Sequence, residues 1–311
     1  MGRFVKKVCL YIFLVFLALE TLVRVFHLYN DAPDWYLDDN EVYRRVPGQK
    51  GYSVFGNRRQ QFAPYHINNA GYNSYHEFEP ANDKLEIAIL GDSFIEGLHQ
   101  DYRNSIGKKV ENELSDLEVY EYGHSDFDLA DQMHLVRTDS EEFEKIDFII
   151  YELKYYNDLL RGAYSLKPRK VVFPLLRHSK LLVYLLDIGM IDSVKKLLRK
   201  LSIGQEPRKG MGANPDKDKI FMDNFIKLCT EYGFQKDKTA FLMDTRQTNK
   251  AFLEYLKKNG FYVIDYGRQF EKSKEQPTTL IYDQHWNNHG RSLIAKEIVS
   301  FFESIKPLKQ L

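Results

Sequence analysis

From residue 85 onward, short apolar runs alternate with segments in which apolar residues recur every three or four positions. The first pattern is typical of buried strands and the second of amphipathic helices. The runs predict strands at 85–90, 118–122, 147–153, 239–244 and 261–265. The periodic segments predict helices near 104–115, 127–139, 217–232, 246–259 and 289–304. This alternation predicts an α/β fold with a parallel sheet, helices on both faces, and a functional site in loops at the carboxyl ends of the strands.

The start of the chain has a different pattern. Basic side chains precede a run from Val8 to Phe26 that is apolar except near Glu20 and Arg24. At roughly 1.5 Å per residue the run extends about 28 Å, close to the thickness of the hydrocarbon layer of a bilayer. No convincing small-x-small cleavage site follows, so we expect residues 1–27 to form one uncleaved transmembrane anchor; a cleaved signal peptide is the alternative.

The anchor predicts how the chain is oriented in the membrane. The cationic amino end stays in the cytoplasm by the positive-inside rule, so the body is expected to be periplasmic or extracellular, in a single-pass membrane protein bound to the lipid bilayer. Glu20 and Arg24 lie four residues apart on one helical face near the far end, where they can pair or reach the interface.

Two further segments lie outside the alternating pattern. Residues 28–83 are rich in Tyr, Asn, Asp, Gly and Pro and show little periodicity, which predicts a stalk and a surface-packed extension before an α/β domain at 84–311. Residues 160–216 carry 12 basic and 4 acidic side chains among apolar residues at helical spacing, which predicts a basic helical insertion. Its basic side is either an ordinary solvated face or a cap that shapes the substrate pocket or contacts anionic lipid headgroups.

Composition narrows the class of protein. The chain is 43% hydrophobic, and its 44 basic residues balance 44 acidic ones, which argues against a general nucleic-acid binder. Its two cysteines are Cys9, inside the anchor, and Cys229, far along the chain. Because these two lie in different phases, no intrachain disulfide is expected.

A serine follows the first predicted strand. The run from Leu85 to Leu90 leads through Gly91 to Ser93, where a helix is expected to begin. A hydroxyl at this place is exposed at the carboxyl edge of the sheet, and the N–H groups of the helix start can stabilise an oxyanion. Ser93 is therefore a candidate nucleophile, although a serine that only caps a helix would produce the same local pattern.

Partners for a nucleophilic serine occur later in the chain. His285 can accept the proton of Ser93, and Asp283 can hold the tautomer of His285 and stabilise its imidazolium form. Asn157, just beyond the predicted strand at 147–153, offers an amide that can donate to an oxyanion. Order along the chain is no obstacle, because such triads are defined by the roles of the residues.

Together these residues resemble the SGNH hydrolases, the GDSL-type esterase superfamily, over roughly residues 84 to 305. The resemblance implies a flavodoxin-like three-layer α/β/α fold with a parallel sheet. It implies Ser93 as nucleophile, Asn157 as oxyanion donor, and Asp283 and His285 as the remaining members of the triad. The Asp-x-His-Trp sequence is also similar to SGNH-like proteins of bacterial polysaccharide O-acetylation.

Three positions depart from the family pattern. Tyr155 replaces the glycine before the oxyanion asparagine, and a single residue, Gln284, separates the terminal Asp and His. The block that normally supplies a backbone N–H to the oxyanion hole has Asp126 at the glycine position, or Gly123 in a shifted register. A carboxylate there would repel a developing oxyanion, and loss of one donor typically lowers the rate by about 10²–10³.

The expected function is serine acyl-ester hydrolysis in the cell envelope, on O-acyl groups of carbohydrate or lipid, without a cofactor or metal. The oxyanion would be held by the N–H of Ser93, by Asn157, and by a backbone N–H near Gly123 or Asp126. The alternatives are an O-acetyltransferase of an envelope polysaccharide and an impaired binding module that retains the fold.

A metal-dependent hydrolase is a further alternative. His285 and His289 are four residues apart with Asp283 nearby, as in some zinc sites, but Trp286 replaces the glutamate of the metalloprotease pattern. His124 and His134 fit no zinc spacing. We expect Trp286 to pack under its loop and Asp92 to stabilise a turn.

Overall fold

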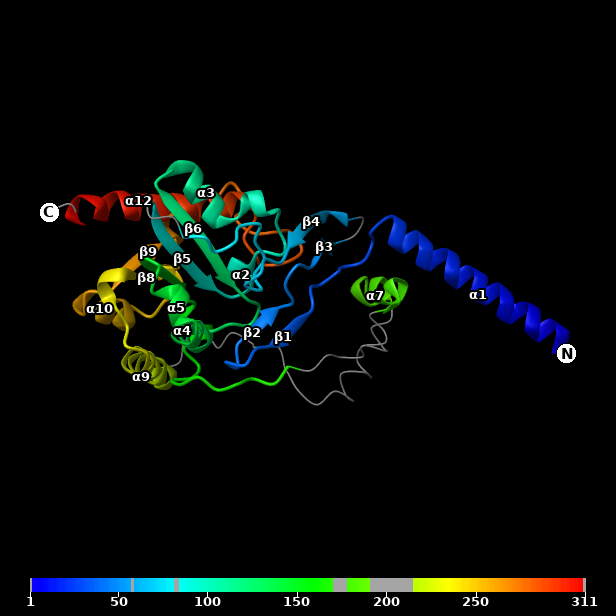
Figure 1. Cartoon of the computed structure of the whole chain (residues 1–311), viewed down its shortest axis with the longest axis horizontal. Helices are drawn as coiled ribbons and strands as arrows, with labels where there is room; N and C mark the ends of the chain where they lie inside the picture. Colours follow the sequence, from blue (N-terminus) through cyan, green and yellow to red (C-terminus); the bar gives the residue numbers. More distant parts are fainter. Residues whose placement is uncertain (1, 57–58, 81–83, 170–177, 191–214, 310–311) are drawn as a thin grey trace. The chain divides into compact units, whose positions relative to one another are not determined.

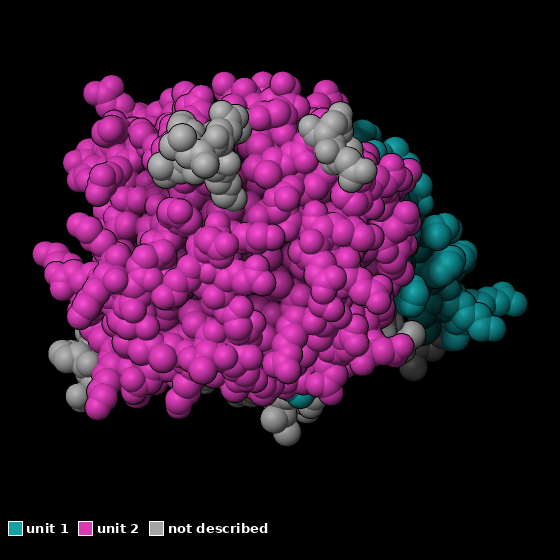
Figure 2. All heavy atoms as spheres, turned by 60° about the vertical axis from the view of Figure 1, so that its left-hand side comes forward, with its two compact units in different colours: residues 1–32, 51–63, 167–207 teal, residues 33–50, 64–166, 208–311 magenta. Residues whose placement is uncertain are grey.

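The computed structural model describes residues 2–56, 59–80, 84–169, 178–190 and 215–309 (Figure 1). Two compact units are distinguished by colour in Figure 2. Unit 1 consists of Met1–Ala32, Gly51–Ala63 and Lys167–Pro207, and unit 2 consists of Pro33–Lys50, Pro64–Leu166 and Arg208–Leu311.

A five-stranded parallel sheet forms the centre of unit 2. Its strands are β5 (Leu85–Gly91), β6 (Leu117–Gly123), β7 (Phe148–Glu152), β8 (Thr239–Met243) and β9 (Tyr262–Asp265). Their order across the sheet is β6-β5-β7-β8-β9, and every neighbouring pair is parallel. This is the flavodoxin-like strand order. The predicted parallel α/β fold is confirmed, and each predicted strand is present.

Apolar side chains leave β5 alternately toward the two faces of the sheet, because successive strand residues point in opposite directions. Ile87 and Ile89 enter a core shared with α3 (Ile106–Glu113) and α12 (Asn288–Lys309). Ala88 and Leu90 enter a second core that also contains residues of three other helices. Those helices are α4 (Leu129–Thr138), α9 (Pro215–Tyr232) and α10 (Lys250–Lys258). The three layers of an α/β/α fold result.

These five long helices are the predicted ones, with ends shifted by a few residues. The helix predicted from 246 begins as a 3-10 turn, which precedes α10. The short helix α2 (Ser93–Glu96) begins at Ser93, as predicted, and α7 (Lys180–Asp187) is a helix within the predicted helical insertion. Other short elements were not predicted, because three to six residues are too few to show a clear period. They are α5 (Ser140–Phe143), α6 (Tyr155–Asp158), α11 (Gly267–Lys272), and the 3-10 turns Tyr102–Asn104, Lys236–Lys238 and Thr245–Gln247.

The segment before β5 contains two small sheets. β1 (Trp35–Leu37) pairs with β2 (Tyr43–Arg45), and β3 (Lys50–Phe55) pairs with β4 (Gln61–His66). Val42, Tyr43 and Tyr72 lie in the core of unit 2 together with residues of the sheet. The domain boundary at residues 83 and 84 stays a prediction.

Unit 1 contains the long helix α1 (Gly2–Val25), which is long and apolar enough to cross a membrane. The predicted pair within it is present, with Arg24 Nε 2.7 Å from Glu20 Oε1. Of the predicted basic insertion, residues 170–177 and 191–214 lie outside the described part of the chain. Between them, α7 packs against α1.

Candidate active site

Ser93 is the first residue of α2, two residues after β5 ends. The carboxylate of Asp92 accepts a hydrogen bond from the N–H of Phe94 at 2.9 Å, so the predicted turn-stabilising role of Asp92 is confirmed. The first N–H groups of a helix have no partner within the helix, and the N–H of Ser93 has no acceptor among the described residues. Ser93 therefore offers both a hydroxyl and an N–H donor at the carboxyl end of β5.

The backbone of α2 rests directly on the end of β6. A Cβ atom added to Gly123 would lie 2.0 Å from the backbone nitrogen of Glu96 and 2.5 Å from the carbonyl carbon of Ile95. No side chain fits there, so the glycine is required by the close approach of two backbones. Gly123 thus supports the helix that carries Ser93, and a role as oxyanion donor stays a prediction.

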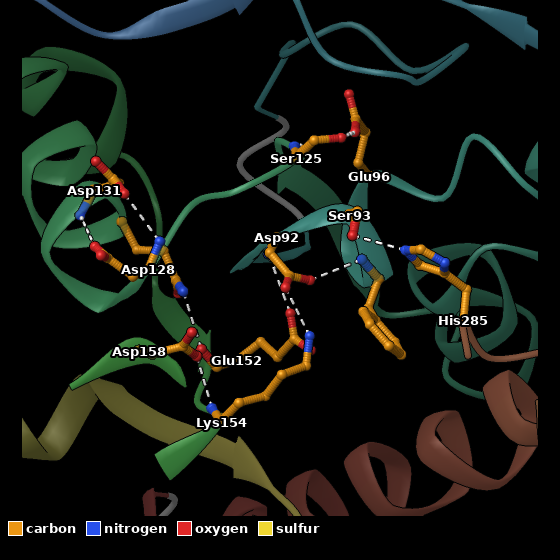
Figure 3. Close-up of polar contacts among 12 residues, drawn as sticks. Asp92, Ser93, Glu96, Ser125, Asp128, Asp131, Glu152, Lys154, Asp158 and His285 are labelled. Carbon is orange, nitrogen blue, oxygen red and sulfur yellow. Dashed lines mark hydrogen bonds and ion pairs between the residues drawn. The ribbon is translucent and has the colours of Figure 1, made fainter. Parts of the chain in front are cut away.

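The structure brings the three residues of the predicted triad together, although they come from distant parts of the chain (Figure 3 shows Ser93 and His285). His285 Nε2 lies 2.7 Å from Ser93 Oγ, and His285 Nδ1 lies 2.7 Å from Asp283 Oδ1. The same carboxylate oxygen accepts the backbone N–H of His285 at 2.6 Å. This double contact fixes the imidazole against the loop that precedes α12.

These contacts determine which nitrogen of His285 is basic. A carboxylate can only accept at Nδ1, so the proton resides there and Nε2 keeps its lone pair for the hydroxyl of Ser93. Burial raises the pKa of Asp283, but the hydrogen bonds from His285 outweigh burial and hold that pKa below its ordinary value. The carboxylate therefore stays charged and can stabilise an imidazolium.

A second imidazole, from His99, completes what we call the His285 cluster, namely His99, Asp283 and His285. Its ring centroid is 4.1 Å from that of His285, and its Nε2 is 3.7 Å from Asp283 Oδ2. Burial and the neighbouring His285 lower the pKa of His99 to about 4. His99 is therefore neutral near pH 7 and packs beside the triad without adding a charge.

Aromatic side chains close the other sides of the imidazole. The ring of Phe94 lies 4.5 Å from His285 and 4.8 Å from Trp286, centroid to centroid. Trp286 is buried and also contacts Tyr266 at 5.3 Å. The prediction that Trp286 packs under its loop is confirmed. Neither Phe94 nor His99 was predicted, since each lies in an unremarkable local sequence.

A group of charged residues lies on the side of Ser93 away from His285, as Figure 3 shows, and we call it the Lys154 cluster: Asp92, Glu152, Lys154 and Asp158. Lys154 Nζ is 2.8 Å from Asp92 Oδ2 and 2.9 Å from Glu152 Oε1. Glu152 Oε2 accepts the backbone N–H of Asp92 at 3.1 Å, and Asp158 accepts that of Lys154 at 2.7 Å. The cluster ties the turn before Ser93 to the turn that carries Asn157.

Burial dominates the ionisation of the inner carboxylates of this cluster. It raises the pKa of Glu152 to about 7, with a further contribution from the charge of Asp92. Burial also raises the pKa of Asp158. Burial alone would lower the pKa of Lys154, but the charges of Asp92 and Glu152 raise it above its ordinary value. Lys154 therefore remains cationic and holds the carboxylates in place. The signal in the sequence was a pair of charges, Glu152 and Lys154, directly after an apolar run.

A second ion pair holds the far end of α2. Glu96 is buried; Arg45 Nε lies 2.7 Å from Glu96 Oε1, and the backbone N–H of Ser125 donates to Oε2 at 3.1 Å. The hydroxyl of Ser125 also donates to this carboxylate. Burial raises the pKa of Glu96, but the charges of Arg45 and His124 outweigh burial and bring that pKa to about 2. The segment before β5 thus braces α2 and the loop after β6.

The remaining oxyanion candidates occupy suitable elements. Asn157 lies in α6, directly after β7, and its side-chain amide has no hydrogen-bond partner within the described part of the chain. Asp126 follows β6 and has φ +68°, the left-handed conformation that favours glycine. Asp126 is also exposed.

The structure separates the two histidines of the zinc alternative. His289 Nε2 lies 2.6 Å from Ser273 Oγ, so this imidazole is engaged elsewhere. The donors near His285 come instead from the His285 cluster, whose ligand atoms lie within 4.8 Å of one another. In this arrangement Asp283 Oδ1 and His285 Nε2 are already used in the contacts that lead to Ser93, which suits proton transfer.

No family model and no curated protein matches the chain. Solved structures with a similar fold include a lipolytic protein of the G-D-S-L family from Veillonella parvula, which is 13% identical, with a TM-score of 0.41 over 70% of this chain and 98% of that one. A lipase/acylhydrolase from Enterococcus faecalis is 13% identical, with a TM-score of 0.43 over 70% and 95%. A psychrotrophic esterase from Pseudoalteromonas is 12% identical, with a TM-score of 0.40 over 73% and 100%. These structures are similar in fold, and the chemistry of the site is inferred from the side chains of this chain.

Proposed function

We propose that this chain is a serine acyl-ester hydrolase of the SGNH class, anchored in a membrane and acting in the cell envelope. The observation that carries the proposal is the line of hydrogen bonds from Ser93 Oγ through His285 to Asp283, with both distances at 2.7 Å. A serine placed this way, beside the N–H groups of a helix start, is equipped for nucleophilic attack on a carbonyl. The substrates we infer are O-acyl groups of carbohydrate or lipid.

The reaction would proceed in two halves. Ser93 Oγ bonds to the ester carbonyl carbon while its proton moves to His285 Nε2. The tetrahedral intermediate then breaks its bond to the alcohol, which leaves with the proton from His285, and an acyl-Ser93 ester remains. In the second half, water gives a proton to His285 and attacks the acyl group; the acid departs, and Ser93 regains its proton.

Charge on the carbonyl oxygen requires hydrogen-bond donors. We assign the N–H of Ser93, the amide of Asn157 and a backbone N–H near Gly123 or Asp126 to this role, because these groups all lie after the carboxyl ends of β5, β6 and β7. Such donors stabilise the transition state because they are already oriented before the reaction begins. The Lys154 cluster supports this proposal by holding the turns of Ser93 and Asn157 together.

Labelling with a fluorophosphonate tests the proposal most directly. The wild-type chain should form a covalent adduct, and Ser93→Ala should form none while its circular dichroism stays unchanged. Turnover of p-nitrophenyl acetate against longer esters would then define the acyl length. Absence of labelling in a folded wild-type chain would favour the impaired binding module over an enzyme.

Transfer to a sugar hydroxyl is the second candidate, and it is favoured by the Asp-x-His-Trp sequence around His285. It uses the same acyl-Ser93 ester, because only the second acceptor differs. An oligosaccharide acceptor separates the two reactions: acylated sugar is the expected product of a transferase, whereas a hydrolase releases free acid at an unchanged rate.

The anchor is part of the same proposal. α1 exposes its apolar side chains along almost its whole length, and basic residues precede them, which supports a single span with the remaining chain outside the cytoplasm. Contacts of Glu20 with residues 179–181 support retention of this helix, since cleavage after Glu20 would remove the carboxylate that makes them. Protein from cells should keep its first residues and stay with membranes through carbonate washing. A soluble form beginning between about residues 20 and 35 would indicate a signal peptide instead.

A further inference from the structure

The amino end of α7 is capped by a side chain of α1. Glu20 Oε1 accepts the backbone N–H of Lys180 at 2.9 Å, and Glu20 Oε2 accepts that of Leu181 at 2.8 Å. The hydroxyl of Ser179 donates to Glu20 Oε2 at 2.9 Å. Arg24 also takes part, because its Nη2 donates to the carbonyl of His178 at 2.6 Å while its Nε contacts Glu20. We call these contacts of Glu20 and Arg24 with residues 178–181 the joint. Two segments more than 150 residues apart are thus joined by a carboxylate.

This joint accounts for an acidic residue in an otherwise apolar helix. A carboxylate in a membrane span is unfavourable unless charged or hydrogen-bonding groups partner it. Glu20 has such partners, and the positive end of the α7 dipole adds to their stabilisation. The contacts therefore hold the start of α7 at the same depth as Glu20.

That depth lies near the boundary of the hydrocarbon layer. Glu20 precedes the end of the apolar run at Phe26 by six residues, about 9 Å along the helix axis. α7 has eight residues, about 12 Å, and cannot cross a layer of about 30 Å. Every residue from Leu181 to Leu186 is apolar or aromatic. A short apolar helix held at this depth is suited to lie along the interface.

We propose that α7 and the turn after it bind the bilayer, with their apolar side chains among the acyl chains next to the end of α1. This inference rests on the proposed anchor. Met190, just after α7, is 72% exposed, and Ile188 is 38% exposed; acyl chains would cover both. Lys180 supports this orientation, since its Nζ lies 4.6 Å from the ring centroid of Tyr29 and 2.8 Å from Asp31. Tyrosine and lysine side chains of this kind are typical of the headgroup level.

Spin labelling of the full chain in phosphatidylcholine vesicles tests this proposal. Cys9 and Cys229 are replaced by alanine, and a single cysteine is introduced by Met190→Cys. The matched control is Ile220→Cys, an isoleucine on α9 that is 54% exposed. Collision with oxygen, which concentrates in the acyl layer, is compared with collision with a water-soluble nickel chelate. The ratio of oxygen to nickel accessibility should be several-fold higher at position 190 than at position 220.

A third sample adds Glu20→Ala to the Met190→Cys chain, and its ratio should fall toward that of the control, because an isolated helix of eight residues is not stable. A label at position 190 that meets the nickel chelate as readily as position 220, in protein that remains with the vesicles, would overturn the proposal. Spin–spin broadening at position 190 that disappears on dilution with unlabelled chain would overturn it too, since a second copy would then cover α7. Protein lost from the vesicles during carbonate washing would contradict the anchor itself.

Discussion

Two groups of charged and titratable side chains flank Ser93. In one group the pKa of a carboxylate is lowered, and in the other the pKa of a carboxylate is raised. In the His285 cluster, Asp283 keeps about a fifth of its side chain exposed (19%), and hydrogen bonds from His285 hold its pKa below the ordinary value. In the Lys154 cluster, the side chain of Glu152 is 2% exposed, and burial with the charge of Asp92 raises its pKa to about 7.

The difference separates two tasks. In the His285 cluster, His285 Nε2 contacts Ser93 Oγ with its lone pair, so this nitrogen can take and return a proton. The Lys154 cluster contacts the turn of Ser93 through Asp92, and its central cation stays charged, so we expect it to hold that turn in place. Variants in the first cluster should therefore affect turnover, whereas variants in the second should affect folding first.

The largest effect is expected where the two clusters meet. Ser93→Ala should lower ester turnover by about 10⁶-fold, with the free energy of unfolding nearly unchanged, because the nucleophile is removed and little packing is lost. His285→Ala added to Ser93→Ala should lower the residual rate little further, since the triad acts as a unit. Stopped assays with p-nitrophenyl acetate and urea titrations measure both quantities. Fully multiplicative losses would argue against a triad.

Lys154→Met should instead destabilise the fold. Removing the cation leaves buried carboxylates without a compensating positive charge, which typically lowers the free energy of unfolding by about 3–5 kcal/mol. The matched control is Glu152→Gln with Lys154→Met, which removes both charges of the pair and should recover much of the loss. Urea unfolding gives the values. A single variant as stable as wild type would show that the cluster does not brace the site.

The two clusters should also respond oppositely to pH. Glu152 has a raised pKa, so the stability linked to it is complete below its ordinary pKa of 4.5 and lost as pH rises toward about 7. Asp283 has a lowered pKa, so its contribution is present above its ordinary pKa of 3.8 and lost as pH falls. Melting temperatures measured from pH 3 to 8 should show a flatter upper limb in Glu152→Gln and a flatter acid limb in Asp283→Asn. Equal changes in both limbs for either variant would contradict these assignments.

A variant of His99 and a chelator together test whether the His285 cluster acts as part of a serine triad or as a metal site. His99→Gln should lower kcat about tenfold with KM nearly unchanged, because the ring that packs on His285 is lost while the triad contacts remain. EDTA should leave the rate of ester turnover by the wild-type chain unchanged. A loss of activity in EDTA that Zn²⁺ restores would instead assign His99, Asp283 and His285 as ligands of a metal-dependent hydrolase.

The smallest effect is expected at Asp126. Asp126→Gly should raise ester turnover several-fold, because a carboxylate within about 5 Å of a developing oxyanion repels it. Relief of the left-handed backbone should add about 1 kcal/mol to the free energy of unfolding. A lower rate would mean that Asp126 contacts substrate and that the N–H near Gly123 is the donor.

Local patterns in the sequence were enough to predict the sheet, its five long helices and the apolar span near the amino terminus. A period of two in a strand or of 3.6 in a helix is set by residues only a few positions apart. The candidates Ser93, Asp283, His285 and Asn157 could be selected because each follows a strand or lies in a late loop, and parallel strands bring such ends to one edge.

Tertiary structure alone decided the contacts among residues far apart in the chain. Lys154 and Asp92 are 62 residues apart, Arg45 and Glu96 are 51 apart, and neither pairing has a local signature. Whether a buried carboxylate is matched by a cation, as Glu96 is by Arg45, depends on how elements pack and on how much water they exclude. The same holds for Glu20, whose sequence neighbourhood predicted the pair with Arg24, while its role as the cap of α7 arises only when the two helices meet.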